Sequence, residues 1–511
     1  MNLQRRTLAS FVLGVALVSG LSAPVANAAP NNNNTRKLLE AVTPEGVMQH
    51  EQAFQQIADA NGGTRASGTP GYAPSVQYVV EQLTAAGYTP QIQEFEFPFF
   101  QELSPAVLER VAPGAASYET DTFTFSGPGD VTAPATLVDV QIPPAPTPGS
   151  TSGCEASDFV GFPVGNIAVL QRGTCNFSVK AVNAQNAGAS AVVIFNEGQP
   201  GRTGVVDGTL GGPVVTIPVV AASFATGQEL YGLRNDGLVL HVKADTISET
   251  STTWNVIAET DKGRDDNVVV VGAHLDSVVA GPGINDNGSG SSTILEIARQ
   301  MAKVNPKNTV RFIWFGAEEL GLLGSEYYVS QLSPAEREDI AVMLNFDMVG
   351  SPNFVRFVYD GDNSAFPVGT NVAAGPPGSG YIEKVFVDYF ASRGLASEPT
   401  AFSGRSDYGP FIEAGIPAGG LFTGAEEIKT PAQAAIYGGT AGVPYDICYH
   451  EPCDTLANVN VTAIDQMSDA AAYAILVLAQ NTEGVNGVKG KGNFKPKKLP
   501  PESQGGPQLA A

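Results

Sequence analysis

Three short apolar runs constrain the fold of this chain more than any other feature. They read "NVVVVGAH", "TVRFIWFG" and "AVMLNFDM", at residues 267–274, 309–316 and 341–348, and amphipathic helical patterns separate them. Runs that are apolar at nearly every position are typical of strands covered on both faces, and strands that alternate with helices form parallel sheets. The sequence therefore predicts an α/β fold in which helices flank a mostly parallel central sheet.

Changes in texture along the chain divide it into domains. Residues 34–112 and 246–483 carry the helix and strand patterns of this α/β domain, whereas residues 113–245 contain short β-branched runs broken by Gly and Pro. We expect the middle part to be a small β-rich domain inserted into the first. Residues 484–511 are rich in Gly, Pro and Lys, which predicts a disordered basic tail. With 511 residues, 43% of them hydrophobic and 15% charged, the chain is long enough for each domain to have a core.

Residues 1–28 have the pattern of a secretory signal peptide. Arg5 and Arg6 precede an apolar stretch that is shorter than a bilayer span, and small residues follow up to Ala28. No later stretch is long enough to cross a membrane, so we expect a secreted, extracellular protein without membrane contact. The paired arginines leave open whether export uses the general or the twin-arginine route.

Charge and cysteine content limit the candidate functions further. Fifty-one acidic residues against 28 basic ones give a formal net charge of −23, which disfavours nucleic acid as a partner. The chain has four cysteines, an even number in a protein expected outside the cell, and this predicts disulfides. Of the three possible connectivities we expect the two local ones, Cys154 with Cys175 and Cys448 with Cys453. We expect a monomer.

Polar residues at the ends of the three apolar runs predict a metal site. The carboxyl ends of parallel strands meet at one edge of a sheet, where ligands bind in such folds. Imidazole and carboxylate groups without a thiolate suit zinc. Any one such residue is more often structural, and only their joint occurrence indicates a site. The candidate ligands are His274, Asp286, Glu318, Glu319, Asp347 and His450.

Neighbouring residues refine this site. Asp276, two positions after His274, points to the same side of the strand and is expected to orient the imidazole. Adjacent residues of an extended segment point to opposite sides, so Glu318 and Glu319 are expected to have different roles, one holding metal and the other acting on substrate. The remaining two histidines receive no function, because His50 is expected on a surface helix and His241 in the last strand of the insert.

Five segments resemble those that carry the site in secreted two-zinc aminopeptidases of the bacterial leucyl aminopeptidase and aminopeptidase Y type. They are "GAHLDS", "INDNGSG", "FGAEELGLLGS", "NFDMVG" and "YHEPCDT". The insert resembles a protease-associated domain through "VLQRGTCNF" and "TIPVVAAS". The resemblance covers nearly all of residues 35–482 and implies a zinc exopeptidase fold with two zinc ions per chain. Asp286 would bridge both ions, His274 and Asp347 would complete one site, and Glu319 and His450 would complete the other.

The resemblance also implies roles toward the substrate. Glu318 would take a proton from the attacking water and pass it to the leaving amine. Tyr449 would donate a hydrogen bond to the tetrahedral oxyanion. Arg405 lies in a segment that contributes backbone near the substrate's N-terminus, and Met348 and Phe422 match positions that line the specificity pocket. The expected substrates are peptides or proteins with free N-termini, with preference for a large apolar first residue such as leucine.

Other functions stay open at this point. A zinc carboxypeptidase of the same fold would need a positively charged receptor for the terminal carboxylate, and Arg405 is the one nearby candidate. A non-enzymatic binding ectodomain would be marked by loss of metal ligands, and none of these positions is lost. Calcium is a further hypothesis, because Asp465 and Asp469 stand four residues apart on a C-terminal helix and repel each other unless a cation or the helix dipole offsets the repulsion.

Overall fold

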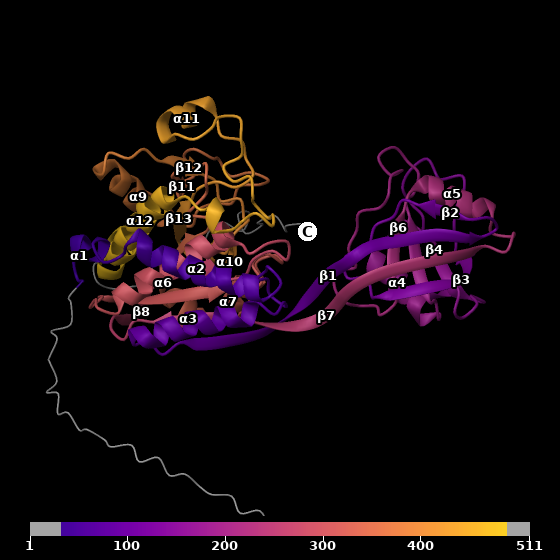
Figure 1. Ribbon diagram of the computed structural model, residues 1–511, viewed down its shortest axis with the longest axis horizontal. Helices are drawn as coiled ribbons and strands as arrows, with labels where there is room; N and C mark the ends of the chain where they lie inside the picture. Colours follow the sequence, from indigo (N-terminus) through magenta and orange to yellow (C-terminus); the bar gives the residue numbers. More distant parts are fainter. Residues whose placement is uncertain (1–31, 488–511) are drawn as a thin grey trace, which may run out of the picture.

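The computed structural model describes residues 32–487, which form two bodies joined by a long two-stranded ribbon (Figure 1). The main body holds the first three helices and everything that follows the ribbon, and the insert lies between the two ribbon strands. In Figure 1 the main body is on the left and the insert stands well apart from it on the right. The predicted signal peptide and most of the predicted tail lie outside the described residues.

The main body is built on a mixed, mostly parallel sheet. Its strand order is β12-β11-β13-β10-β8-β9-β7, in which β13, β10, β8 and β9 run parallel and β7 and β11 run antiparallel to their neighbours β9 and β13. The predicted α/β fold is therefore confirmed. The strand bounds are β7 Val239–Glu259, β8 Arg264–His274, β9 Asn308–Phe315, β10 Ile340–Phe346, β11 Phe357–Tyr359, β12 Glu398–Thr400 and β13 Ala418–Phe422.

The central strands are buried because helices cover both faces of the sheet. Alternate residues of β8 enter different clusters: Val269 and Val271 pack with α2, α3, α6, α9 and α12, whereas Val268 and Val270 pack with α7 and α10. This two-sided burial explains why the strand sequences are apolar at nearly every position. The helices of the main body are α1 Thr35–Leu39, α2 Pro44–Ala60, α3 Tyr72–Ala86, α6 Gly290–Met301, α7 Leu323–Gln331, α8 Pro334–Asp339, α9 Ser379–Ser392, α10 Tyr408–Glu413, α11 Pro431–Tyr437, α12 Val461–Gln480 and α13 Glu483–Asn486.

Several local expectations need correction. His50 lies on α2, but it is buried, with Nδ1 2.7 Å from the Tyr78 hydroxyl and Nε2 3.4 Å from Glu296, because α2 packs against α6. The expected tail begins inside the folded body, since Val485 of α13 is buried. Among the described residues, one helix, α12, is long and apolar enough to cross a membrane, although we expected no such stretch. Most of α12 is buried against α1, α2, α6 and α9, as in the core helix of a globular domain.

The ribbon consists of β1 (Gln91–Ala112) and β7, which pair antiparallel from Gln91 and Ile257 to Ala112 and Val239. The expected second boundary, 245/246, falls within β7, which continues without a break from the insert into the main body. His241 of β7 lies between two carboxylates of the ribbon region, with Nδ1 3.0 Å from Glu109 and Nε2 2.8 Å from Asp130.

The insert continues the sheet from β7 through β3, β4, β5 and β6. It has its own apolar clusters, and its first half is tied by a disulfide between Cys154 and Cys175. Its elements are β2 Ala116–Tyr118, β3 Gly129–Leu137, η1 Ala156–Phe159, β4 Ile167–Gln171, α4 Phe177–Asn186, β5 Ala191–Phe195, β6 Val219–Ala222 and α5 Phe224–Gly232.

Candidate metal centre

The candidate ligands meet at the carboxyl edge of the main sheet. His274 is the last residue of β8, Glu318 and Glu319 lie in the turn after β9, and Asp347 directly follows β10. Asp286 lies in η2 (Ile284–Ser289), between β8 and α6. His450 arrives on a loop that a second disulfide, Cys448 to Cys453, closes.

Five of the six side chains form two donor groups that share Asp286. In the first group, Nε2 of His274 lies 3.2 Å from Oδ1 of Asp286 and 3.3 Å from Oδ1 of Asp347. In the second, Nε2 of His450 lies 3.2 Å from Oδ2 of Asp286 and 3.0 Å from Oε2 of Glu319. Each group of three could hold one metal ion. Because the two oxygens of Asp286 face different groups, the two positions are adjacent.

Buried carboxylate oxygens in these two groups favour the binding of cations. Oε1 of Glu319 and Oδ1 of Asp347 are buried without a hydrogen-bond partner, which is costly unless another ligand satisfies them. Burial and the charge of Asp286 raise the pKa of Glu319 to about 7. Burial alone would raise the pKa of Asp286 too, but its bonds to His274 and His450 outweigh burial and lower it. Imidazole nitrogens and carboxylate oxygens in this number fit zinc.

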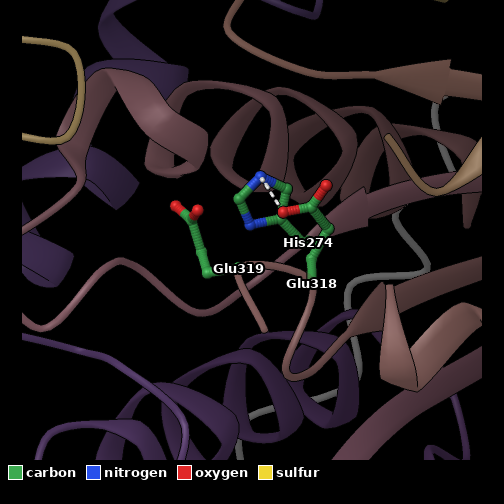
Figure 2. A group of neighbouring side chains, drawn as sticks. All are labelled: His274, Glu318 and Glu319. Atoms are coloured by element: carbon green, nitrogen blue, oxygen red, sulfur yellow. Dashed lines mark ion pairs between the residues drawn. The ribbon is translucent and has the colours of Figure 1, made fainter. Parts of the chain in front are cut away.

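Glu318 occupies a different place from Glu319. Figure 2 shows the two carboxylates on either side of the His274 ring, and the oxygen of Glu318 approaches that ring only to 3.8 Å. The side chain is almost fully buried at 8% exposure, and burial, opposed by the charge of His274, raises its pKa well above the usual range. Glu318 therefore lies outside the two groups that share Asp286, although with His274 and Glu319 it forms a third group that could hold a metal ion.

Comparison with known proteins decides the family. Residues 255–475 match the description of Peptidase family M28, and residues 131–230 match that of the PA domain. An aminopeptidase of Pseudomonas aeruginosa is 46% identical over 472 residues, which are 89% of this chain and 86% of that protein. The chain belongs to peptidase family M28. The M28 peptidase is also 38% identical over 441 residues to leucine aminopeptidase 2 of Trichophyton equinum, with coverage of 86% of this chain and 84% of that one.

A solved structure agrees with this assignment. The zinc aminopeptidase of Bacillus subtilis has a TM-score of 0.54 and 25% identity, covering 89% of this chain and 98% of that one. The M28 peptidase thus groups with aminopeptidases along most of its length, and the expected protease-associated domain in the insert is confirmed as a PA domain.

Hydrogen bonds hold the candidate ligands of the M28 peptidase in place. Nδ1 of His274 donates to the backbone carbonyl of Asp276 at 3.1 Å, and the Asp276 carboxylate, 3.6 Å from the same nitrogen, accepts from the N–H of Glu318 at 3.2 Å. The hydroxyl of Ser406 donates to Oδ2 of Asp347 at 2.5 Å. Asp276 therefore links two of the site segments, while sequence reasoning missed Ser406.

The backbone of the site is held in sparsely populated conformations. Ala317, Met348 and His450 have φ values of 55°, 47° and 59°, the left-handed region that residues with a Cβ rarely adopt. Each such residue costs of order 1–3 kcal/mol and persists only where the surrounding structure imposes it. All three adjoin or form part of the ligand set, so packing of the M28 peptidase sets the directions of these side chains.

Two buried aspartates behind the ligands were not anticipated. Asp454, at 2% exposure, accepts the backbone N–H of Asn285 at 2.8 Å on one oxygen and that of Asp286 at 2.9 Å on the other. Asp446 accepts from the Asn285 side chain at 2.7 Å and from Asn458. Asp454 belongs to the quoted segment "YHEPCDT", so its place in that segment with His450 was a usable signal, whereas Asp446 follows no pattern.

A buried arginine shapes the segment between His274 and Asp286. The Arg65 guanidinium donates to the carbonyls of Pro282 at 2.9 Å and Gly283 at 2.6 Å and also to that of Leu275, and it stacks over Phe54 at 4.9 Å. Nothing in the sequence around Arg65 indicated this contact, because its partners lie about two hundred positions away in the chain.

A cavity of about 440 Å³ opens beside the ligands. Met348 and Phe422, expected at the specificity pocket, both line it. Tyr449 and Arg405 also line it, and the two side chains contact each other, since Nη2 of Arg405 donates to the Tyr449 hydroxyl at 3.1 Å. The other apolar or aromatic lining residues include Phe357, Tyr359, Phe366, Ala425 and Tyr445, and its acidic lining beyond the ligands consists of Glu398 and Glu427.

The two aspartates considered for calcium lie far along the chain, on α12. Asp465 is exposed, whereas Asp469 faces α9, where the Tyr389 hydroxyl donates to it at 3.3 Å and Arg393 lies 3.8 Å away. Burial, followed by the charge of Asp465, raises the pKa of Asp469 to about 6. The positive charge of Arg393 therefore already offsets part of the negative charge of Asp469.

Proposed function

We propose that this M28 peptidase is an exported aminopeptidase that uses two zinc ions to remove large apolar N-terminal residues from peptides. The observation that carries the proposal is the pair of donor groups, His274–Asp286–Asp347 and Asp286–Glu319–His450, that share one carboxylate. Two groups joined in this way suit a pair of adjacent ions acting on one substrate. The names of the relatives, which are aminopeptidases, support the same reaction class.

In the proposed enzyme, His274 and Asp347 would hold one ion, Glu319 and His450 the other, and Asp286 both. When bound, the zinc ions would polarise the scissile carbonyl and lower the pKa of the attacking water. The unpartnered oxygens of Glu319 and Asp347 support this assignment, because both are buried and accept no hydrogen bond.

Glu318 is proposed as the general base. Its carboxylate stands beside His274 without belonging to either shared group, so it is available to take a proton from the attacking water and to deliver it to the leaving amine. Its burial supports this role, because a carboxylate with a raised pKa transfers protons more readily near neutral pH.

Tyr449 is proposed to stabilise the oxyanion. Burial and the charge of Asp286 raise the pKa of its hydroxyl, so that it stays protonated and can donate a hydrogen bond. The ring stacks on His450 with 3.8 Å between centroids, and Arg405 donates to the hydroxyl oxygen. The proton of the hydroxyl is thereby left for the substrate.

The existing contacts of the Arg405 guanidinium favour an aminopeptidase over a carboxypeptidase. A receptor for a terminal carboxylate needs an unpaired cation, but Nη1 of Arg405 forms an ion pair with Glu426 at 2.8 Å and Nη2 contacts Tyr449. An α-ammonium group, by contrast, can pair with the carboxylates that line the cavity beside the candidate ligands. Met348 and Phe422 in the cavity lining support preference for a large apolar first residue.

Export is proposed because both expected disulfides are present in the fold, and disulfides persist in oxidising compartments. The secretory pattern of residues 1–28 points the same way.

Digestion of matched peptides tests the reaction. One peptide set has a free N-terminus, one is N-acetylated, and one is amidated at the C-terminus. We expect stepwise release from free N-termini, with or without the C-terminal amide, and no release from the acetylated set. Activity should disappear with a chelator and return with zinc. Release from C-termini would establish a carboxypeptidase, and internal cleavage or no cleavage by the zinc-loaded protein would reject an exopeptidase.

A further inference from the structure

We propose that the ribbon strand β7 positions the turn that carries Glu318 and Glu319, and that Asn255 and Thr253 of β7 are the positioning residues. This inference rests on the proposed aminopeptidase function, and it links that reaction to the strand that carries the PA domain. Neither of the two ribbon side chains lines the cavity beside the candidate ligands. Both would therefore act through the backbone of the turn.

The Asn255 side chain takes the place of main-chain pairing where β7 leaves the central sheet. The last paired residues of β7 and β9 are Val256 and Trp314, and Asn255 is the next residue of β7 toward the insert. Its side chain is fully buried. Its Oδ1 accepts the N–H of Gly316 at 3.0 Å, and its Nδ2 donates to the carbonyl of Gly324 at 2.9 Å. One ribbon side chain thus holds the loop of the two glutamates where it leaves β9 and where α7 begins.

Thr253 supports the next residue of the turn through Ser67. The hydroxyl oxygens of Thr253 and Ser67 lie 2.9 Å apart, and that of Ser67 accepts the N–H of Ala317 at 2.9 Å. Both hydroxyl side chains are buried. Ala317 has a left-handed φ of 55°, a conformation that persists only where the surrounding structure imposes it. The Thr253–Ser67 pair therefore helps to impose the conformation of the residue directly before Glu318.

The N–H group of Glu318 completes a series of three. It donates to the Asp276 carboxylate at 3.2 Å. Three successive N–H groups of the turn, those of residues 316, 317 and 318, thus each donate to a buried side chain from a different segment. The first acceptor belongs to β7, and the second is bonded to β7. The direction in which the two glutamates leave the turn therefore depends on the ribbon strand.

The turn packs directly against β7. A Cβ atom on Gly316 would overlap the Tyr72 hydroxyl and would lie 2.7 Å from the carbonyl oxygen of Trp254. A Cβ atom on Gly324 would lie 2.5 Å from Oδ1 of Asn255. Real Cβ atoms do not approach other atoms so closely, so only glycine fits at both positions. A shift of the strand is therefore transmitted to the turn.

The other ribbon strand, β1, also contacts the turn. Gln93 of β1 pairs with Asn255 and accepts from its Nδ2 at 2.9 Å. One face of β1 forms an apolar cluster with the turn, whose buried members are Phe95, Phe97, Phe99 and Ala317. The ring of Phe95 also stacks on Tyr327 of α7, with centroids 5.0 Å apart. Figure 1 shows α7 at the main-body end of the ribbon, so both ribbon strands meet the turn where they enter the main body.

A displaced turn would affect two functions together. Glu318 is the proposed base and Glu319 a proposed ligand, so proton transfer and zinc binding would both suffer. A misplacement of about 1 Å can lower turnover about 10²-fold, and loss of groups that orient metal ligands typically lowers metal affinity about 10- to 100-fold. KM should change little, because Met348 and Phe422 of the cavity do not belong to this turn.

Two substitutions at Thr253 separate positioning from packing. Thr253→Val keeps the shape and removes the hydroxyl, whereas Thr253→Ser keeps the hydroxyl and removes the methyl group. We expect Thr253→Val to lower both zinc affinity and kcat for leucine p-nitroanilide about 5-fold, the contribution of one hydrogen bond between neutral groups, and Thr253→Ser to retain both. Zinc affinity is measured by competition with a chromogenic chelator, so this readout does not depend on activity.

Asn255→Leu tests the larger contact. It removes the bonds at both ends of the loop, and we expect kcat and zinc affinity to fall about 10- to 100-fold with KM near the wild-type value. Glu94→Leu is the matched control. Glu94 pairs with Trp254, the neighbouring ribbon position, and accepts from its Nε1 at 3.0 Å, but it is exposed and points to the opposite face. This control should keep the wild-type kcat and zinc affinity.

Each other outcome decides the inference. Losses in Thr253→Ser but not in Thr253→Val would show a packing role and overturn it. Equal losses in Asn255→Leu and Glu94→Leu would show that only ribbon stability matters, which also overturns it. If circular dichroism shows that Asn255→Leu does not fold, the Thr253 pair decides alone. If the zinc-loaded wild type releases no leucine, the proposed function fails, and the zinc affinities decide this inference by themselves.

Discussion

Asp454→Asn should weaken zinc binding, although Asp454 is not a proposed ligand. The Asp454 carboxylate accepts two backbone N–H groups, those of Asn285 and Asp286, one on each oxygen. Asparagine has only one side-chain oxygen, so one of these N–H groups would lose its acceptor and face an NH2 group. Since the site is buried, an N–H without a partner costs about 1–3 kcal/mol.

This loss should reach the metal through Asp286, whose two oxygens serve both donor groups. Substitution of residues that orient metal ligands typically lowers metal affinity by about 10- to 100-fold. We therefore expect Asp454→Asn to bind zinc about that much more weakly and to unfold at a lower temperature in its metal-free form. Zinc affinity can be measured by competition with a chromogenic chelator, and unfolding by circular dichroism.

Glu451→Gln is the matched control for this change. Glu451 lies three residues before Asp454, and its substitution removes the same charge, but its side chain is exposed. We expect its zinc affinity and unfolding temperature to match those of the wild type. If Asp454→Asn also binds zinc with wild-type affinity, the two backbone bonds do not position Asp286 and the reasoning fails.

Three further predictions concern other parts of the molecule. Glu318→Gln should keep its zinc but lose turnover by roughly 10² to 10⁴ or more, as expected for a general base, whereas Glu319→Gln should lose zinc; metal analysis showing the reverse would exchange the two roles. Millimolar calcium should raise the melting temperature of the wild type by binding the folded state, and equal shifts in Asp465→Asn/Asp469→Asn would remove that site. Hydrogen bonds that His241 donates to Glu109 of β1 and Asp130 of β3 raise its pKa above 6.5, so its stabilising effect is full below pH 6.5 and disappears as the pH rises through the raised pKa. The difference in melting temperature between wild type and His241→Gln should therefore shrink with rising pH, and a constant difference from pH 6 to 9 would contradict this assignment.

The sequence indicated the elements of the site that follow local rules. Buried parallel strands are apolar at nearly every position, and their ends carry the ligands, so His274 and Asp347 could be found from pattern alone. Glu398 could not be found in this way, because β11 and β12 have 3 residues each and show no periodicity. Their register depends on pairing with β13, which is remote in the chain.

Errors arose where a partner distant in sequence changes the meaning of a local pattern. His50 lies on an amphipathic helix, α2. The sequence pattern of α2 does not show that its polar side is covered by α6, which carries Glu296. The ribbon strands run for 22 and 21 residues, far longer than the usual five or six, and Pro98 and Pro105 within β1 conceal its continuity. The length comes from the two strands pairing with each other, which sequence texture does not reveal.

The pairing of the ribbon strands favours one order of folding over another. Gln91 and Ile257 pair at its main-body end, Ala112 and Val239 pair at its insert end, and the whole insert lies between them in the chain. Closing an unstructured loop of roughly 10² residues costs about 4 kcal/mol of chain entropy. If the insert folds first, it brings both strands into register, and pairing can proceed toward the main body without that barrier. Because β7 then pairs with β9, the PA domain would act as an internal nucleus for the sheet that carries the metal ligands.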